Sequence, residues 1–272
     1  MKMLFLGQCL QLGYEGVPPP ATYPHLAHAA LSTRFPDLNF IFDVRLLGHP
    51  TGLKALLRYR LAAFKPDVVV ISTLAAFAAT EWRSGILYAI APEIALRARL
   101  FLQNLDAKFR RGPLFAKLLD QTQGLRPEIT HPPLQIDEYE RLLEDGINQC
   151  RQTSACRVVL MGPGGFNEDT RNDFRLQSPE LWSSVNQMVL RLGERLDVPV
   201  INAQEALHEY GGEVYLPDDH RFSLYGQAVV AREVEAVLAA QVALLLHDHN
   251  DDPDEKLRRS SAQGGFGAIE DA

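Results

Sequence analysis

A cysteine stands where the first strand of the chain is expected to end. The short apolar run Met3-Leu4-Phe5-Leu6 is followed directly by Gly7-Gln8-Cys9. In parallel α/β sheets the carboxyl ends of the strands face the ligand crevice, so a thiol on the first turn is presented to substrate. Because a thiolate beside an imidazole is a strong nucleophile, Cys9 is a candidate for covalent catalysis.

A histidine flanked by acids, late in the chain, could serve as the partner base. Asp218-Asp219-His220 lies just before Phe222-Ser223, where the last long helical pattern begins. We assign His220 as the general base, with Asp218 (or Asp219) to orient its ring. A structural reading stays open, in which His220 is an ordinary loop residue and Cys9 is a small buried side chain.

These residues must be positioned by strands that alternate with helices. Short β-branched runs and longer helical patterns follow one another, which predicts a parallel sheet covered by helices on both faces. The predicted strands are residues 2–6, 39–44, 67–72, 157–161 and 198–202, and the predicted helices are 23–34, 53–64, 136–152, 179–196 and 223–246. Every candidate residue then lies near the carboxyl end of a strand or the start of a helix.

The order of the motifs resembles the SGNH/GDSL hydrolase family of esterases, lipases and acyltransferases. The resemblance implies a flavodoxin-like, three-layer α/β/α fold with a five-stranded parallel sheet, and it covers about residues 1–246 apart from residues 75–133. Gly7-Gln8-Cys9-Leu10 stands where the family has its Gly-Asp-Ser turn, so cysteine replaces the nucleophilic serine. Gly48 matches the glycine whose amide helps to form the oxyanion hole, and His49 beside it could line the pocket.

The third block of the family is incomplete here. Lys65-Pro66-Asp67-Val68-Val69-Val70-Ile71 fits the strand, but the asparagine that follows it in the family is absent, and Leu74 or Ala76 stands near its position. One oxyanion donor is worth about 3 to 4 kcal/mol of barrier in tested hydrolases, so a substitute is needed. Asn167, in the loop after 157–161, is a candidate.

The last block is shifted by one residue. When Phe222-Ser223 is aligned with the family, Asp218 falls on the catalytic aspartate but Arg221 falls on the histidine, and His220 comes one residue early. A loop can absorb one residue, so His220 is kept as the base. The shift and the missing asparagine together also fit an inactive member of the fold that serves as a binding or scaffold protein.

Cysteine in place of serine changes the expected chemistry, because the covalent intermediate becomes a thioester. Moving an acyl group from a thioester donor to Cys9 replaces one thioester with another, so its free energy changes little. We therefore favour acyl transfer from an acyl thioester or ester to an alcohol, an amine or water. The donor could be carried by an acyl carrier protein or by coenzyme A, although neither has a motif here. Plain esterase or thioesterase activity is the alternative.

Composition limits the remaining possibilities. At 272 residues with 46% hydrophobic residues, the chain predicts one domain over residues 1–246, with a helical insertion or lid at about 75–133 and an acidic polar tail at 247–272. The tail has seven acids and three bases, so most of the net charge of −7 lies there and a nucleic-acid partner is disfavoured.

No metal, no cofactor and no membrane-spanning segment is expected. Cys9, Cys150 and Cys156 have no metal-type spacing, and no apolar stretch approaches the 18 to 20 residues or so that a span needs. No signal-peptide pattern is found at the start, which favours the cytoplasm.

Overall fold

The computed structural model describes residues 1–251 except 8, 15, 48, 76–77, 79–81, 86–127, 132, 154–155, 166–178 and 217–220. At residues 9, 82–85, 128–131 and 249–251 the description is limited to the backbone.

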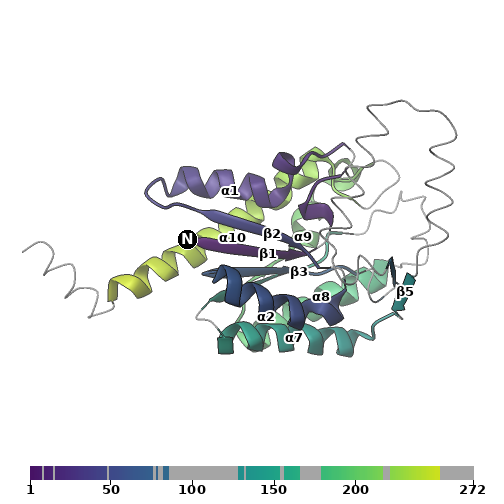
Figure 1. The fold of residues 1–272 in the computed structure, drawn as a ribbon. Coiled ribbons are helices and arrows are strands. Elements are labelled where there is room, and N and C mark those ends of the chain that lie inside the picture. Colours follow the sequence, from purple (N-terminus) through teal and green to yellow (C-terminus); the bar gives the residue numbers. More distant parts are fainter. Residues whose placement is uncertain are drawn as a thin grey trace, which may run out of the picture.

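A five-stranded, all-parallel sheet forms the centre of the molecule (Figure 1). Its strands lie in the order β2-β1-β3-β6-β7, which is the flavodoxin-like arrangement in which the first strand pairs with both the second and the third. The bounds are β1 Lys2–Gly7, β2 Ile41–Leu46, β3 Val68–Ser72, β6 Arg157–Met161 and β7 Val200–Ile201. The predicted sheet is therefore confirmed.

Helices cover both faces of this sheet and complete a three-layer α/β/α fold (Figure 1). One face is covered by α1 Tyr23–Arg34, α9 Ala203–His208 and α10 Leu224–Asp251. The other is covered by α2 Leu53–Phe64, α7 Ile136–Thr153 and α8 Pro179–Leu196. Short 3-10 turns at Cys9–Gln11, Pro19–Ala21, Pro50–Gly52 and Gly211–Val214 lie in the connections.

Alternate residues of each strand enter opposite layers of the core. Leu4 and Leu6 pack with α2, α7 and α8, whereas Met3 and Phe5 pack with α1 and α10, and all four are fully buried. A strand buried on both faces needs apolar residues at every position, which explains the continuous run Met3-Leu4-Phe5-Leu6.

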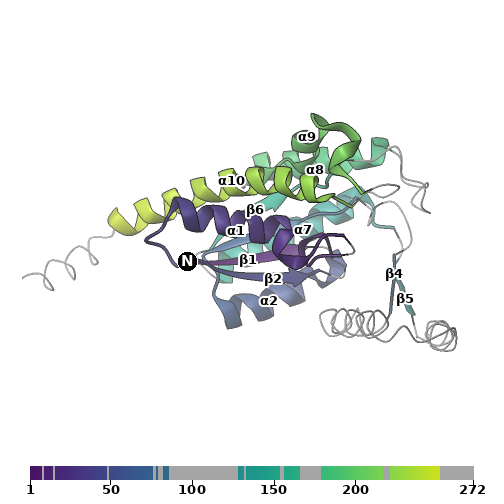
Figure 2. The ribbon, with the colours of Figure 1, turned by 90° about the horizontal axis from the view of Figure 1, so that it is seen from above.

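The structure corrects three details of the predicted elements. The predicted helical insertion at about 75–133 contains two strands, β4 Trp82–Gly85 and β5 Glu128–His131, which pair antiparallel and project from the body (Figure 2). Residues 86–127 lie outside the described residues. α9 was not predicted. α10 continues past residue 246 to Asp251, because no proline or glycine stops it before Pro253.

Among the described residues, no helix is both long and apolar enough to cross a membrane.

Candidate active site

A pocket opens at the carboxyl edge of the sheet. Its empty volume of about 340 Å³ includes open solvent, so the enclosed part of the pocket is small. Its described lining comes from the ends of β3 and β6, from the loop after β1, and from three helices or their flanks: Leu10, Tyr23, Ser72, Thr73, Leu74, Met161, Gly162, Gly164, Trp182 and Phe222. This edge is where the sequence places the candidate chemistry.

The loop after β1 is joined to the loop before α10, although more than 200 residues separate them. The Tyr14 hydroxyl donates a hydrogen bond to the carbonyl of Phe222. The Arg221 guanidinium stacks over the Tyr14 ring, 5.2 Å from its centroid. Leu10 and Phe222 both line the pocket. The backbone next to Cys9 and the backbone next to His220 therefore meet at one place.

A buried glutamine on α10 fixes this junction. The amide Nε2 of Gln227 donates to the carbonyl of Leu10 at 3.2 Å and to the Tyr14 hydroxyl at 2.9 Å. Its Oε1 accepts from the backbone N–H of Tyr23 at 2.7 Å. Because Gln227 is completely buried, these bonds supply partners that water cannot provide. They hold the loop after β1 between α1 and α10.

Tyr23 and Ser72 are polar residues of the pocket lining, and Tyr23 also contacts the buried side chain of Gln11. The Gln11 amide Nε2 lies 2.6 Å from the Tyr23 hydroxyl oxygen, and Tyr23 is also hydrogen-bonded to the Ser72 side chain. Gly7 makes this possible, since a Cβ there would lie 2.3 Å from Nε2 of Gln11 and 2.8 Å from Cβ of Ser72. Burial raises the pKa of Tyr23 well above its usual value, so its phenol stays protonated at neutral pH.

The glycines after β6 make room for aromatic and amide side chains. A Cβ on Gly164 would lie 2.4 Å from the Phe222 ring, and one on Gly162 would lie 2.3 Å from Oδ1 of Asn186. A hydrogen bond joins the backbone of Gly165 to Tyr215, whose pKa is raised by burial to about 12. Close packing therefore accounts for these glycines.

Most of the side chains predicted for catalysis lie outside the described residues. The backbone of Cys9 begins the 3-10 turn after β1, but its side chain is not described, and Gly48, Asn167, Asp218 and His220 also fall outside. Their described neighbours Leu10, Phe222 and Gly165 lie at the carboxyl edge. The structure thus brings together the segments next to Cys9 and next to His220, and the side-chain roles of all the predicted residues stay predictions.

His49 is the one predicted site residue with a described side chain. It is 7% exposed and precedes the 3-10 turn Pro50–Gly52. Its Nδ1 accepts from the backbone N–H of Thr51 at 3.4 Å and lies 2.9 Å from the Thr51 hydroxyl oxygen. Acceptance at Nδ1 leaves the ring proton of a neutral imidazole on Nε2. His49 is not among the described residues that line the pocket.

Sequence reasoning missed the polar wall of the pocket. Tyr23 begins a predicted helix and Ser72 ends a predicted strand, so both positions could be located from the pattern. Their contact could not, because it depends on how α1 packs against the sheet. No cluster of three metal-ligating side chains occurs among the described residues.

Comparisons with known proteins find likeness in structure only. No family model and no curated protein matches the sequence. Solved structures do match. The acetylxylan esterase Axe2 of Geobacillus stearothermophilus has a TM-score of 0.54 at 15% identity over 86% of this chain and 91% of its own.

Two further hydrolases give the same result. The acetyl xylan esterase AlAXEase has a TM-score of 0.56 at 14% identity, with 87% of this chain and 99% of its own covered. LAE5, an alpha/beta hydrolase from the metagenome of Lake Arreo in Spain, has a TM-score of 0.53 at 17% identity over 89% and 95%. The chain therefore shares the three-layer α/β fold of these hydrolases.

Proposed function

We propose that this protein cleaves small acyl esters or thioesters through a thioester intermediate on Cys9 and passes the acyl group to water or to another small acceptor. The fold shared with acetylxylan esterases supports ester chemistry, and so does the order of the sequence motifs. We place the acyl group in the pocket at the carboxyl edge of the sheet.

One observation carries the proposal: the loop that contains Cys9 and the loop that contains His220 are joined beside the pocket. Tyr14 bonds to Phe222, two residues after His220, and Gln227 bonds to Leu10, one residue after Cys9. A nucleophile and a base must come within hydrogen-bond reach to act together. The partly buried hydrogen bonds of Tyr14 and Gln227 hold the segments next to Cys9 and His220 close together, which supports this pairing.

The proposed reaction has two acyl transfers. His220 accepts the Cys9 proton, Sγ attacks the acyl carbonyl carbon, and the bond to the leaving alcohol or thiol breaks as His220 returns the proton to it. An acceptor then attacks the thioester while His220 takes its proton, and the C–S bond breaks to restore the cysteine thiol. Asp218 holds the imidazole in the required orientation. The backbone amides of Cys9 and Gly48 stabilise the oxyanion.

The identity of the acceptor is a separate question. A thioester is attacked readily by amines and alcohols, so transfer competes with hydrolysis, and an acyl carrier protein or coenzyme A is one source of the acyl group. The structural neighbours act on acetyl esters, which favours an ester donor. Comparing the rates with acetyl-coenzyme A and with a chromogenic acetate ester separates the two donors.

The test is covalent labelling. The protein is incubated with a chromogenic acetate ester, the release of chromophore is measured, and the acetyl adduct is located by mass spectrometry. We expect an acetyl group on Cys9, and a loss of turnover in Cys9→Ala of about 10³-fold or more. Cys156→Ala is the matched control, because Cys156 is a buried thiol at the opposite end of the sheet, before β6.

Two outcomes would reject the proposal. One is an adduct that persists in Cys9→Ala. The other is a Cys9 thiol that reacts with iodoacetamide no faster near neutral pH than an unactivated thiol, since its pKa would then not be lowered. The second result would favour the alternative, an inactive chain that uses the fold as a binding scaffold.

A further inference from the structure

Two thiols meet where α7 ends and β6 begins. Cys150 lies in the last turn of α7, and Cys156 directly precedes the first residue of β6. The Sγ of Cys156 lies 3.9 Å from the carbonyl oxygen of Cys150, and the two thiol groups are hydrogen-bonded to each other. Both residues belong to the same apolar core layer. The reaction proposed for Cys9 gives this pair no part.

These contacts place the two side chains as a disulfide requires. A disulfide needs two cysteines that are close in space and whose side chains point toward each other. The Sγ of Cys156 contacts both the backbone and the thiol of Cys150. Only five residues separate the two cysteines, so a bond between them closes a small ring from a helix end to a strand start.

The surroundings of the pair decide which thiol reacts first. Cys150 is completely buried, whereas Cys156 is 7% exposed. The hydrogen bond with Cys156 and burial both raise the pKa of Cys150, so its thiolate is scarce at neutral pH. Because only the thiolate attacks a disulfide, the reaction starts at Cys156 and is slow compared with that of an exposed, activated thiol.

We propose that Cys150 and Cys156 form a redox site, which a small disulfide such as oxidised glutathione converts from a dithiol to an intrachain disulfide. The Cys156 thiolate, formed by loss of its proton to solvent, attacks one sulfur of oxidised glutathione, and a glutathione thiolate leaves. Cys150 then loses its proton and attacks the Sγ of Cys156 in the mixed disulfide, and the second glutathione thiolate leaves. Both glutathione thiolates take up a proton. Two protein thiols are oxidised, and one molecule of oxidised glutathione is reduced.

The second step is favoured because the attacking thiol is already beside the mixed disulfide and needs no further encounter. The mixed disulfide is therefore short-lived. The new bond fixes the end of α7 to the start of β6.

The first test uses a Cys9→Ala chain, which keeps two of the three cysteines. The folded chain is equilibrated with mixtures of reduced and oxidised glutathione, free thiols are blocked with N-ethylmaleimide, and the chain is digested with trypsin. Cleavage after Arg151 separates the peptides 142–151 and 152–157, each of which has one cysteine. We expect the two peptides to stay joined until a reductant is added.

The second test compares this chain in its folded state with the same chain unfolded in urea. Packing holds the two thiols together only in the folded state, so half of the folded chain should be oxidised in a glutathione mixture at least about tenfold more reducing. This comparison needs no substitution at the pair, so it does not depend on a variant that folds. Cys9→Ala with Cys156→Ala is the matched control, and its Cys150 should take up no glutathione because that thiol is buried and protonated.

Three results would overturn the inference. The folded chain could keep both thiols free in every mixture, or need a mixture as oxidising as the unfolded chain needs. A mixed disulfide with glutathione that persists on Cys156 while Cys150 is free is the third. The proposed function and this inference fail separately, because Cys9 is absent from the chain that carries the test.

Discussion

Gly226, the third residue of α10, lies directly against the backbone that precedes the helix. A Cβ at this position would lie 2.0 Å from the carbonyl oxygen of Val214 and 3.2 Å from Cβ of Phe222. Alanine is the better helix former, so helix propensity alone would favour it. We expect Gly226→Ala instead to lower the free energy of unfolding by about 1 to 3 kcal/mol, because backbone atoms must move, as measured by urea denaturation.

The control for this substitution is Gly52→Ala. A Cβ on Gly52 has no atom within 4 Å, so its effect should stay within about 0.5 kcal/mol. Gly226→Ala should also slow ester turnover, because Phe222 lines the pocket. Equal stabilities for the two variants would show that α10 can shift away from Val214 without cost.

Single residues of the site differ in how far the sequence can identify them. Cys9 and His220 could be proposed from the sequence because a thiol and an imidazole are reactive side chains, placed here at a predicted strand end and just before a predicted helix. Gln227 and Tyr23 could not, since glutamine and tyrosine are common in helices. Their roles arise from contacts such as Tyr23 to Gln227, 204 residues apart, which no local pattern encodes.

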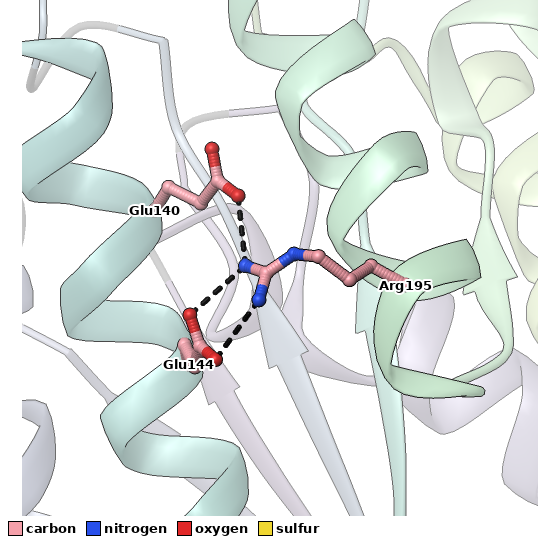
Figure 3. Close-up of polar contacts among 3 residues, drawn as sticks. All are labelled: Glu140, Glu144 and Arg195. Carbon is pink, nitrogen blue, oxygen red and sulfur yellow. Dashed lines mark hydrogen bonds and ion pairs between the residues drawn. The ribbon is translucent and has the colours of Figure 1, made fainter.

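At the scale of elements, α7 and α8 are bridged by one arginine (Figure 3). Arg195 of α8 contacts both oxygens of Glu144, at 3.0 Å and 2.9 Å, and one oxygen of Glu140 at 2.9 Å. The two glutamates are one turn apart on α7, so a single guanidinium can reach both. The hydrogen bond from Arg195 lowers the pKa of Glu144 below the ordinary value of 4.5.

This bridge predicts a pH-dependent contribution to stability. A carboxylate with a lowered folded-state pKa stabilises the fold above its unfolded pKa, and that stabilisation is lost as the pH falls through the folded pKa. Arg195→Gln should therefore be less stable than the parent at pH 7, and the difference should shrink as the pH falls below 4.5.

The measurement is urea denaturation of the parent protein and of Arg195→Gln from about pH 7 down to about pH 3. High salt should also reduce the difference, because the groups are exposed. Glu194→Gln, a neighbouring charge change without a part in the bridge of Figure 3, is the control. If Arg195→Gln lowers the free energy of unfolding by the same amount at pH 7 and at pH 3, packing of the arginine stem, and not its charge, joins the helices.

Most elements could be predicted because their signals are local. The helices at 23–34, 53–64 and 179–196 have the predicted bounds, and the prolines Pro24 and Pro179 lie in their first turns. The missed helix α9 also had a local signal, since Asn202 caps it and Glu205 stands three residues later. The β4–β5 pairing had none, because the partner strand is far along the chain.

At the scale of the whole molecule, one sheet serves two apolar layers. Each central strand contributes alternate residues to both, so neither layer can be lost without exposing the other side of the same strand. The sequence could predict this architecture, because five short, largely apolar runs alternate with helical patterns. The fold is therefore expected to unfold in one cooperative step.

The end of this cooperative unit can be tested by truncation. α10 runs to Asp251, and Asp248 forms an ion pair with Arg157 at 2.7 Å, which ties the last turns of the helix to the start of β6. A chain that ends after residue 251 should therefore keep the free energy of unfolding and the ester turnover of the full chain. A chain that ends after residue 246 should lose up to about 1 kcal/mol, because both groups of the pair are partly exposed. Arg157→Gln in the full chain should reproduce that loss. If the chain ending at 251 is already less stable, residues 252–272 belong to the domain and its boundary lies beyond α10.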